Sequence, residues 1–154
     1  MSKELKIILL ILLGLFVVVQ FIPSGMPENN STNNFNFIAN NNVPTDVANL
    51  LKSSCYDCHS QEVKFPWYSY IAPISWQVAT DINVGREHLD FSNWEELSKR
   101  KKIKMLGEIS DEISIGEMPM RIYKIMHPEA NLSEEQRNQF VNWADNLAEK
   151  IMED

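Results

Sequence analysis

The N-terminus carries the longest apolar run of the chain. Residues 7–22 read IILLILLGLFVVVQFI and follow a short segment that contains Lys3 and Lys6. The run is slightly shorter than the about 20 apolar residues that a membrane-spanning helix needs. It is longer than the apolar core of a signal peptide, which has roughly 7–15 residues. Because residues 23–27 contain no A-x-A-like cleavage site, we predict an uncleaved signal-anchor, a transmembrane helix, over residues 1–22, with a cleaved signal peptide as the alternative. The lysines predict that the rest of the chain lies outside the cytoplasm.

A polar tract rich in asparagine follows over residues 23–43, with eight asparagines between Glu28 and Val43. Asparagine favours turns because its amide competes with regular backbone hydrogen bonding. We therefore interpret residues 23–43 as a linker. Its alternating Phe35, Phe37 and Ile38 indicate either an extended segment on the domain surface or a solvated tether.

From Pro44 onward, apolar positions recur with a helical period, and no segment alternates like a strand. Ser92 with Glu95 and Ser133 with Gln136 are capping boxes that predict helix starts, and Gly116 predicts a helix end. The domain, residues 44–154, is therefore predicted to be all-α, with long loops that a cofactor would have to fill. Its apolar stripes are Val47, Leu50, Leu51; Ile74, Val78, Ile82; Ile103, Leu106, Ile109, Ile113; and Phe140, Trp143, Ala144, Leu147, Ile151.

The first of these helices runs into the most informative motif of the chain, Cys55-Tyr56-Asp57-Cys58-His59. Two thiols three positions apart, followed at once by a histidine, are typical of covalent haem c attachment. Each thiol adds to one vinyl group of the porphyrin, and the His59 imidazole is the proximal axial ligand of iron. A zinc site would need a second pair of ligands, and a redox dithiol would need a βαβ context, neither of which the sequence contains. We predict one covalent haem on Cys55 and Cys58.

Composition narrows the possible partners. The chain of 154 residues has a formal net charge of -7 and only the two cysteines of the motif. The acidic balance argues against a nucleic-acid partner, because little would neutralise a phosphate backbone. The dense basic run Lys99–Lys104 fits a solvated helix face, or alternatively a docking patch for an acidic redox protein.

A haem iron that carries electrons needs a second axial ligand. Met118 stands in a Glu-Met-Pro turn, where Pro119 keeps it out of a helix, and its thioether would raise the reduction potential. Met120, His127 and His88 are the alternatives, and either histidine would give a bis-His haem. Met105 and Met152 lie within predicted helices and fit packing roles.

The segments CYDCHS, PWYSYIAPISW, GREHLDFSNW, GEMP and HPEANLSEEQ together resemble the bacterial haem-binding domain family of small CxxCH proteins, over residues 43–147. The order of a helix with CxxCH, a Met-Pro loop and a last amphipathic helix is also similar to class I c-type cytochromes. That resemblance implies crossing first and last domain helices, Met118 as distal ligand, and a proline carbonyl, from Pro66 or Pro73, that accepts the His59 imidazole N–H.

Other side chains have both a structural and a haem-related interpretation. The aromatic residues Trp67, Tyr68, Tyr70 and Trp76 fit a core, or alternatively a wall of the haem site. Arg86 could pair with a haem propionate.

The expectation for function is a membrane-anchored monohaem cytochrome that passes single electrons between redox proteins on the periplasmic side of the bacterial cytoplasmic membrane. No enzymatic activity and no small-molecule substrate are expected. The alternative is a haem-based sensor or small-ligand binder whose distal ligand is displaceable. A peroxidase would need an open distal position with an acid–base histidine, which the Met-Pro loop disfavours.

Overall fold

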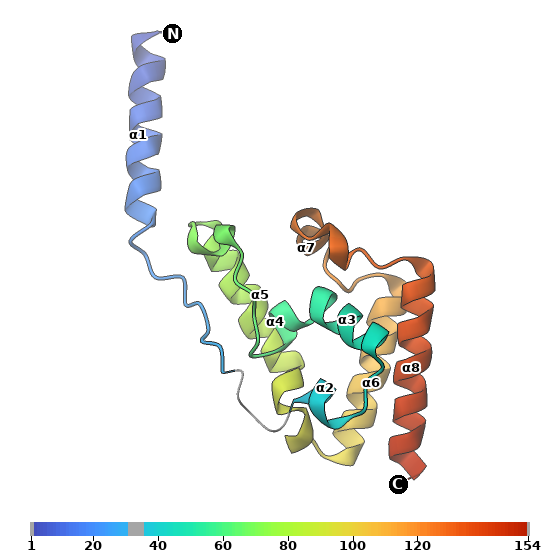
Figure 1. Cartoon of the computed structure of the whole chain (residues 1–154). Helices are drawn as coiled ribbons and strands as arrows, with labels where there is room; N and C mark the ends of the chain where they lie inside the picture. The colour runs from blue at the N-terminus through green and yellow to red at the C-terminus, as the bar shows by residue number, and fades with distance from the viewer. Residues whose placement is uncertain (1, 31–35, 154) are drawn as a thin grey trace.

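A computed structural model describes residues 2–30 and 36–153, which form helices joined by loops, with no strand in these two ranges (Figure 1). This confirms the predicted all-α class. The elements in chain order are α1 (Lys3–Val19), α2 (Phe37–Asn40), α3 (Thr45–Ser54), α4 (Tyr56–His59), the 3-10 helix η1 (Trp67–Tyr70), α5 (Ile74–His88), the 3-10 helix η2 (Phe91–Glu96), α6 (Lys99–Ile115), α7 (Arg121–Met126), the 3-10 turn η3 (Pro128–Ala130) and α8 (Glu134–Glu153).

The core lies between α6, α8 and the short N-terminal helices of the domain. Leu106 of α6 and Phe140 of α8 are each 1% exposed, and they pack with Leu51 of α3 and Trp94 of η2. The main partner of α8 is α6, and α3 touches α8 only slightly. The crossing of first and last domain helices that the class I resemblance implied is therefore not the main helix pair here.

Several helix boundaries follow local signals in the sequence. The capping box is confirmed, since the Ser133 hydroxyl accepts from the Gln136 N–H and the Gln136 side chain accepts from the Ser133 N–H. Gly116 ends α6 in the left-handed conformation, at φ 79°, where a side chain would be strained. The second predicted box is wrong: Asp90, not Ser92, caps the short η2 by accepting from the Ser92 N–H.

The N-terminal helix α1 has 17 residues and no buried side chain. Among residues 2–30 and 36–153, no helix has both the length and the apolarity needed to cross a membrane. The predicted transmembrane helix over residues 1–22 is therefore not supported.

The segment after α1 is attached to the domain, not a solvated tether. The Asn29 side chain donates to the Val63 carbonyl at 2.7 Å and accepts from the Val63 N–H at 3.0 Å. Further on, Asn36 caps α2, and Phe37 is fully buried in the core. Packed structure therefore begins before Pro44, the boundary predicted from the sequence. Phe35, which was considered with Phe37, lies outside the described residues.

Candidate functional site

Cys55 lies between α3 and α4, and Cys58 and His59 follow it within the single turn of α4. The Cys55 N–H donates to the Leu51 carbonyl, and the His59 N–H donates to the Cys55 carbonyl, both at 2.9 Å. Cys55, at φ −126° and ψ −41°, separates α3 from α4. As a result, all three side chains face one cavity.

The cavity has a volume of about 690 Å³ and a largely apolar wall. This volume falls in the roughly 300–1,000 Å³ range of cofactor and ligand pockets. The wall is built by α3, α4, α5, α6 and the loop before α7. Its apolar residues include Leu50, Val84, Leu89, Phe91, Met105, Ile109, Ile113, Leu132 and Phe140.

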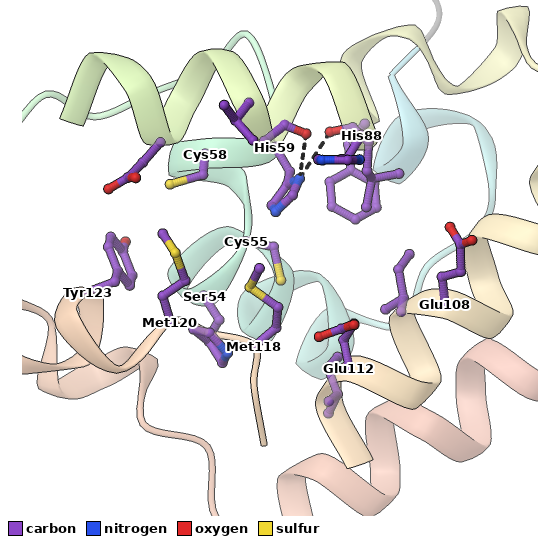
Figure 2. Close-up of a pocket in the computed structure, with 18 of the residues that line it drawn as sticks. Ser54, Cys55, Cys58, His59, His88, Glu108, Glu112, Met118, Met120 and Tyr123 are labelled. Atoms are coloured by element: carbon purple, nitrogen blue, oxygen red, sulfur yellow. Dashed lines mark hydrogen bonds between the residues drawn. The ribbon is translucent and has the colours of Figure 1, made fainter. Parts of the chain in front are cut away.

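The His59 ring is oriented by two backbone carbonyls. Its Nδ1 lies 3.0 Å from the Gly85 oxygen and 3.1 Å from the Leu89 oxygen, so Nδ1 carries the proton and donates. Burial is the main cause that lowers the pKa of His59, partly offset by these two bonds, and the neutral imidazole is favoured. Nε2 then carries no proton, and its lone pair can bind a metal ion. Figure 2 shows this nitrogen directed into the cavity. The carbonyl acceptors are thus Gly85 and Leu89, and neither Pro66 nor Pro73 fills the role that the resemblance implied.

Gly85 also allows α5 to approach the motif. A Cβ added at Gly85 would lie 2.7 Å from the Cys58 carbonyl oxygen, closer than such contacts occur. The absence of a side chain therefore lets α5 pack directly on α4 and brings the Gly85 carbonyl within reach of His59. A glycine inside a helix lowers stability, and at Gly85 this cost accompanies the close approach of the two backbones.

In the folded site the two thiols lack the lowered pKa that is typical of a reactive dithiol. Burial, with a smaller contribution from nearby charges, raises the pKa of Cys55 and of Cys58 to about 12. Redox-active and metal-binding cysteines need the thiolate and have lowered pKa values. Within the described ranges, no three His, Cys, Asp or Glu side chains come together as a metal site. The two cysteines fit covalent attachment of a cofactor through thioethers better than they fit a redox dithiol or a zinc site.

Met118 and Met120 bring two thioethers to the cavity wall across from α5 (Figure 2). The Met118 N–H donates to the Glu112 carbonyl at 3.2 Å, so the loop is held directly against the end of α6. Pro119 is buried between them and also lines the cavity. Met118 and Met120 thus both lie in the cavity wall, and the assignment of Met118 as the second ligand stays a prediction.

The two candidate histidines differ in their positions. His127 does not line the cavity, because its Nε2 lies 2.6 Å from the Tyr68 hydroxyl and its Nδ1 lies 3.0 Å from Glu129. His88 does line the cavity, yet it comes from α5 and lies beside His59 (Figure 2). Two axial ligands must approach iron from opposite faces, so His88 is poorly placed to complement His59.

A hydrogen bond ties the loop side of the cavity to the motif. The Tyr123 hydroxyl of α7 donates to Asp57 at 2.8 Å, and the Tyr123 ring stacks on His127 with centroids 4.2 Å apart. Burial, followed by the Asp57 charge, raises the pKa of Tyr123, which therefore stays a donor. The sequence did not predict this contact, because α7 is too short to show a period and Asp57 and Tyr123 are far apart in the chain.

Two haem-related interpretations of other residues are wrong. None of Trp67, Tyr68, Tyr70 and Trp76 lines the cavity. Trp67 and Tyr70 also contradict the predicted core role, because they are 70% and 71% exposed. Arg86 also lies outside the cavity wall, and its guanidinium donates to the Ser60 and Glu28 carbonyls at 2.8 and 3.1 Å. Arg86 therefore holds the N-terminal segment.

The charged residues of the cavity wall are carboxylates. Glu108 and Glu112 extend from α6 and Asp81 from α5, and no lysine or arginine lines the cavity in the described part of the chain. The sequence spacing of four residues already places Glu108 and Glu112 on one face of α6. That this face borders the cavity is visible only in the folded structure. Of the basic run at the start of α6, Lys102 contacts Glu95 and Lys104 pairs with Glu108 at 2.8 Å.

The model of the haem-binding domain family matches the chain over residues 14–146. No curated protein and no solved structure matches the chain at a significant level. The match spans most of the chain and includes the motif, both walls of the cavity and the Met-Pro loop. The residues present fit the group: an apolar cavity, two thiols on one turn and an imidazole nitrogen fixed toward its interior. The chain belongs to the haem-binding domain family.

Proposed function

We propose that this haem-binding protein is a monohaem c-type cytochrome that carries single electrons between redox proteins. Cys55 and Cys58 would hold the porphyrin through thioethers, His59 would be the proximal ligand and Met118 the distal ligand. The observation that carries the proposal is the position of Met118 across one apolar cavity from the fixed His59 Nε2. When bound, haem supplies an iron that alternates between two oxidation states.

The protein side chains would set how that iron behaves. The Gly85 and Leu89 carbonyls hold the His59 Nδ1 proton, which fixes the ring and raises its basicity. A Met118 thioether favours the reduced iron, whereas the carboxylates of Glu108 and Glu112 favour the positive charge of the oxidised site. Two protein ligands leave no position for a substrate, so the proposal includes no turnover.

The proposed location is the outer side of the bacterial cytoplasmic membrane. The support is the apolar α1, whose side chains are exposed all round, followed by a domain whose motif requires attachment of haem outside the cytoplasm. We propose that α1 associates with the lipid bilayer and keeps the domain near membrane redox partners, which raises its local concentration there.

Spectroelectrochemistry of the haem-matured protein, with and without carbon monoxide, tests this function. A carrier with His59 and Met118 on the iron shows a reversible one-electron couple that carbon monoxide does not shift. Ready binding of carbon monoxide by the reduced wild-type protein would contradict the proposal and favour the sensor or ligand-binder alternative. Met118→Gly is the matched positive control, because it opens the distal position.

A further inference from the structure

An apolar surface lies at one end of the domain, on η1, on the first residue of α5 and, far away in the sequence, on α7. We call it the η1–α7 patch. Large apolar patches on a monomer mark an interaction site, whereas scattered apolar residues do not. Its members and their exposed fractions are Trp67 70%, Tyr70 71%, Ile74 50%, Ile122 62%, Ile125 71% and Met126 48%.

The two halves of the patch are joined. Tyr68, inside η1, bonds through its hydroxyl to His127 Nε2 at 2.6 Å, and His127 follows α7 directly. Figure 1 shows the start of α5, which follows η1, and α7 at the same end of the domain. The hydrogen bond between Tyr68 and His127 therefore holds η1 and α7 at the same end of the domain.

The chain leaves α1 beside this patch. The Gln20 side chain donates to the Ala72 carbonyl at 3.1 Å and accepts from the Ala72 N–H at 3.0 Å. Ala72 lies between Tyr70 and Ile74 in the chain. The Trp76 indole also reaches the Ile22 carbonyl, at 3.5 Å. The C-terminal end of α1 is thus fixed to the loop between η1 and α5, next to Tyr70 and Ile74 of the patch.

The attachment continues along α5. The Asn83 amide donates to the Gly25 carbonyl at 3.3 Å, and Arg86 donates to the Glu28 carbonyl at 3.1 Å. Residues 20–29 therefore follow α5 away from the patch, and α1 leads off in the opposite direction (Figure 1). A bilayer that takes up α1 would meet the domain first at the η1–α7 patch.

We propose that the η1–α7 patch rests on the lipid bilayer surface and fixes the orientation of the domain there. The proposal rests on the proposed association of α1 with membrane. Tryptophan and tyrosine favour the headgroup region, where an apolar ring and a polar group are both satisfied. Ile122, Ile125 and Met126 can enter the acyl boundary, while Arg121 and Lys124 of the same helix suit anionic headgroups.

This contact would bear directly on the cavity. Tyr123 of α7 lines the cavity and bonds to Asp57 of the motif, while its neighbours Ile122 and Lys124 lie in or beside the patch. A short helix with one side toward lipid and one side toward the cavity would hold the cavity at a constant position relative to the membrane. Electron exchange with membrane partners would then occur from one orientation.

Photocrosslinking of the full-length, haem-matured protein in nanodiscs of phosphatidylcholine and phosphatidylglycerol tests the proposal. Benzoylphenylalanine replaces Trp67 in one variant, Ile125 in a second and Met152 in a third. Met152 is the matched control, since it is an apolar residue, 55% exposed, near the C-terminal end of α8, away from α7 (Figure 1). We expect lipid adducts at positions 67 and 125 several-fold above those at position 152.

Equal labelling at all three positions would overturn the proposal, as would adducts only to a second copy of the chain. Failure of the protein to remain with the nanodiscs would also overturn it. The haem absorption spectrum of the same samples reports the cofactor and its ligation independently. A normal haem spectrum without lipid adducts thus rejects the bilayer contact alone, whereas loss of the spectrum rejects the haem assignment.

Discussion

The most specific residue-level feature is the opposition of His59 and Met118 across one cavity. Two carbonyls hold the His59 ring, and the Met118 backbone is bonded to the end of α6. The His59 ring and the Met118 backbone are therefore both held in place by the protein itself. Such preorganisation makes each residue's contribution separately testable.

Met118→Ala should leave haem covalently attached but remove the distal thioether. We expect the reduction potential to fall and the reduced protein to bind carbon monoxide, because one iron position opens. Visible absorption during a carbon monoxide titration measures this. Met120→Ala is the matched control and should behave as wild type. If only Met120→Ala bound carbon monoxide, Met120 and not Met118 would be the distal ligand.

Gly85→Ala should disrupt the contact between α5 and the motif. The new Cβ would meet the Cys58 carbonyl oxygen at 2.7 Å, and overpacking of this kind costs about 1–3 kcal/mol of unfolding free energy. Denaturant unfolding followed by circular dichroism provides the measurement. Gly107→Ala, within α6, is the control: no atom lies within 4 Å of its Cβ, so a gain of about 0.5–1 kcal/mol is expected. Equal stability of the two variants would refute a steric role of Gly85.

At this scale, local chemistry was predictable and long-range partners were not. The spacing of Cys55, Cys58 and His59 fixes their common turn, and the Met118-Pro119 pair marks a loop, so a short segment contains the whole signal. The acceptors of the His59 proton are backbone carbonyls, which every residue has. Only the tertiary position of α5 selects Gly85 and Leu89 over Pro66 and Pro73.

At the scale of elements, α7 closes one side of the cavity through Tyr123 and Asp57. Asp57 also accepts from the Lys64 N–H at 3.1 Å, so one carboxylate joins the motif, the loop after it and α7. A six-residue helix has little stability of its own, and tertiary contacts must hold it. The Met118 loop directly precedes this helix, so its position depends on the same contacts.

Tyr123→Phe should loosen this side of the cavity. Loss of a hydrogen bond to a carboxylate costs about 1–3 kcal/mol, and the freed loop should let imidazole displace the distal ligand more readily. Stopped-flow absorption of imidazole binding to the oxidised protein measures the displacement. Tyr70→Phe, at an exposed tyrosine, should leave the rate unchanged; identical rates in both variants would show that Asp57 and Tyr123 do not position the loop.

Prediction of elements succeeded where the signal was periodic and failed where it was short. The stripes of α6 and α8 extend over 17 and 20 residues and were found from apolar spacing. Ser92 and Glu95 imitate a capping box, but Asp90 captures the Ser92 N–H first and starts a 3-10 turn. The helix α7 has too few residues to reveal a period.

At the scale of the molecule, the cavity lies within the hydrophobic core of the domain. Core residues such as Leu50, Met105, Ile113 and Phe140 are both in the hydrophobic core and in the cavity wall. A group in the cavity would thus complete the core, as the long loops of the sequence suggested. The domain should depend on its cofactor for tight packing.

Cys55→Ala with Cys58→Ala should give a domain that keeps helical far-ultraviolet circular dichroism but loses specific packing. The expected state is collapsed and poorly ordered, since the about 690 Å³ cavity then has no group fixed within it. Proton–nitrogen NMR measures the dispersion of amide signals. Ser53→Ala, beside the motif, is the control that should remain dispersed once matured with haem; a well-dispersed double variant would show that the core stands alone.

The relation of the N-terminal segment to the domain was the least predictable feature at this scale. Composition indicates that an asparagine-rich tract avoids helix and strand; this holds for residues 20–30, but the short helix α2 (Phe37–Asn40) lies inside the tract. It does not indicate whether the amides bond to water or to protein. Here Asn29 and Gln20 pair with the backbone of Val63 and Ala72, so the tract is attached along the domain.

The central claim is one covalent haem whose iron is held by His59 and Met118. Near-infrared magnetic circular dichroism of the oxidised, haem-matured protein tests it most directly, because a methionine–iron(III) bond gives a charge-transfer band that a bis-histidine site lacks. We predict this band in the wild-type protein. A spectrum without it, or with the band of a bis-histidine haem, would contradict the assignment of the iron ligands.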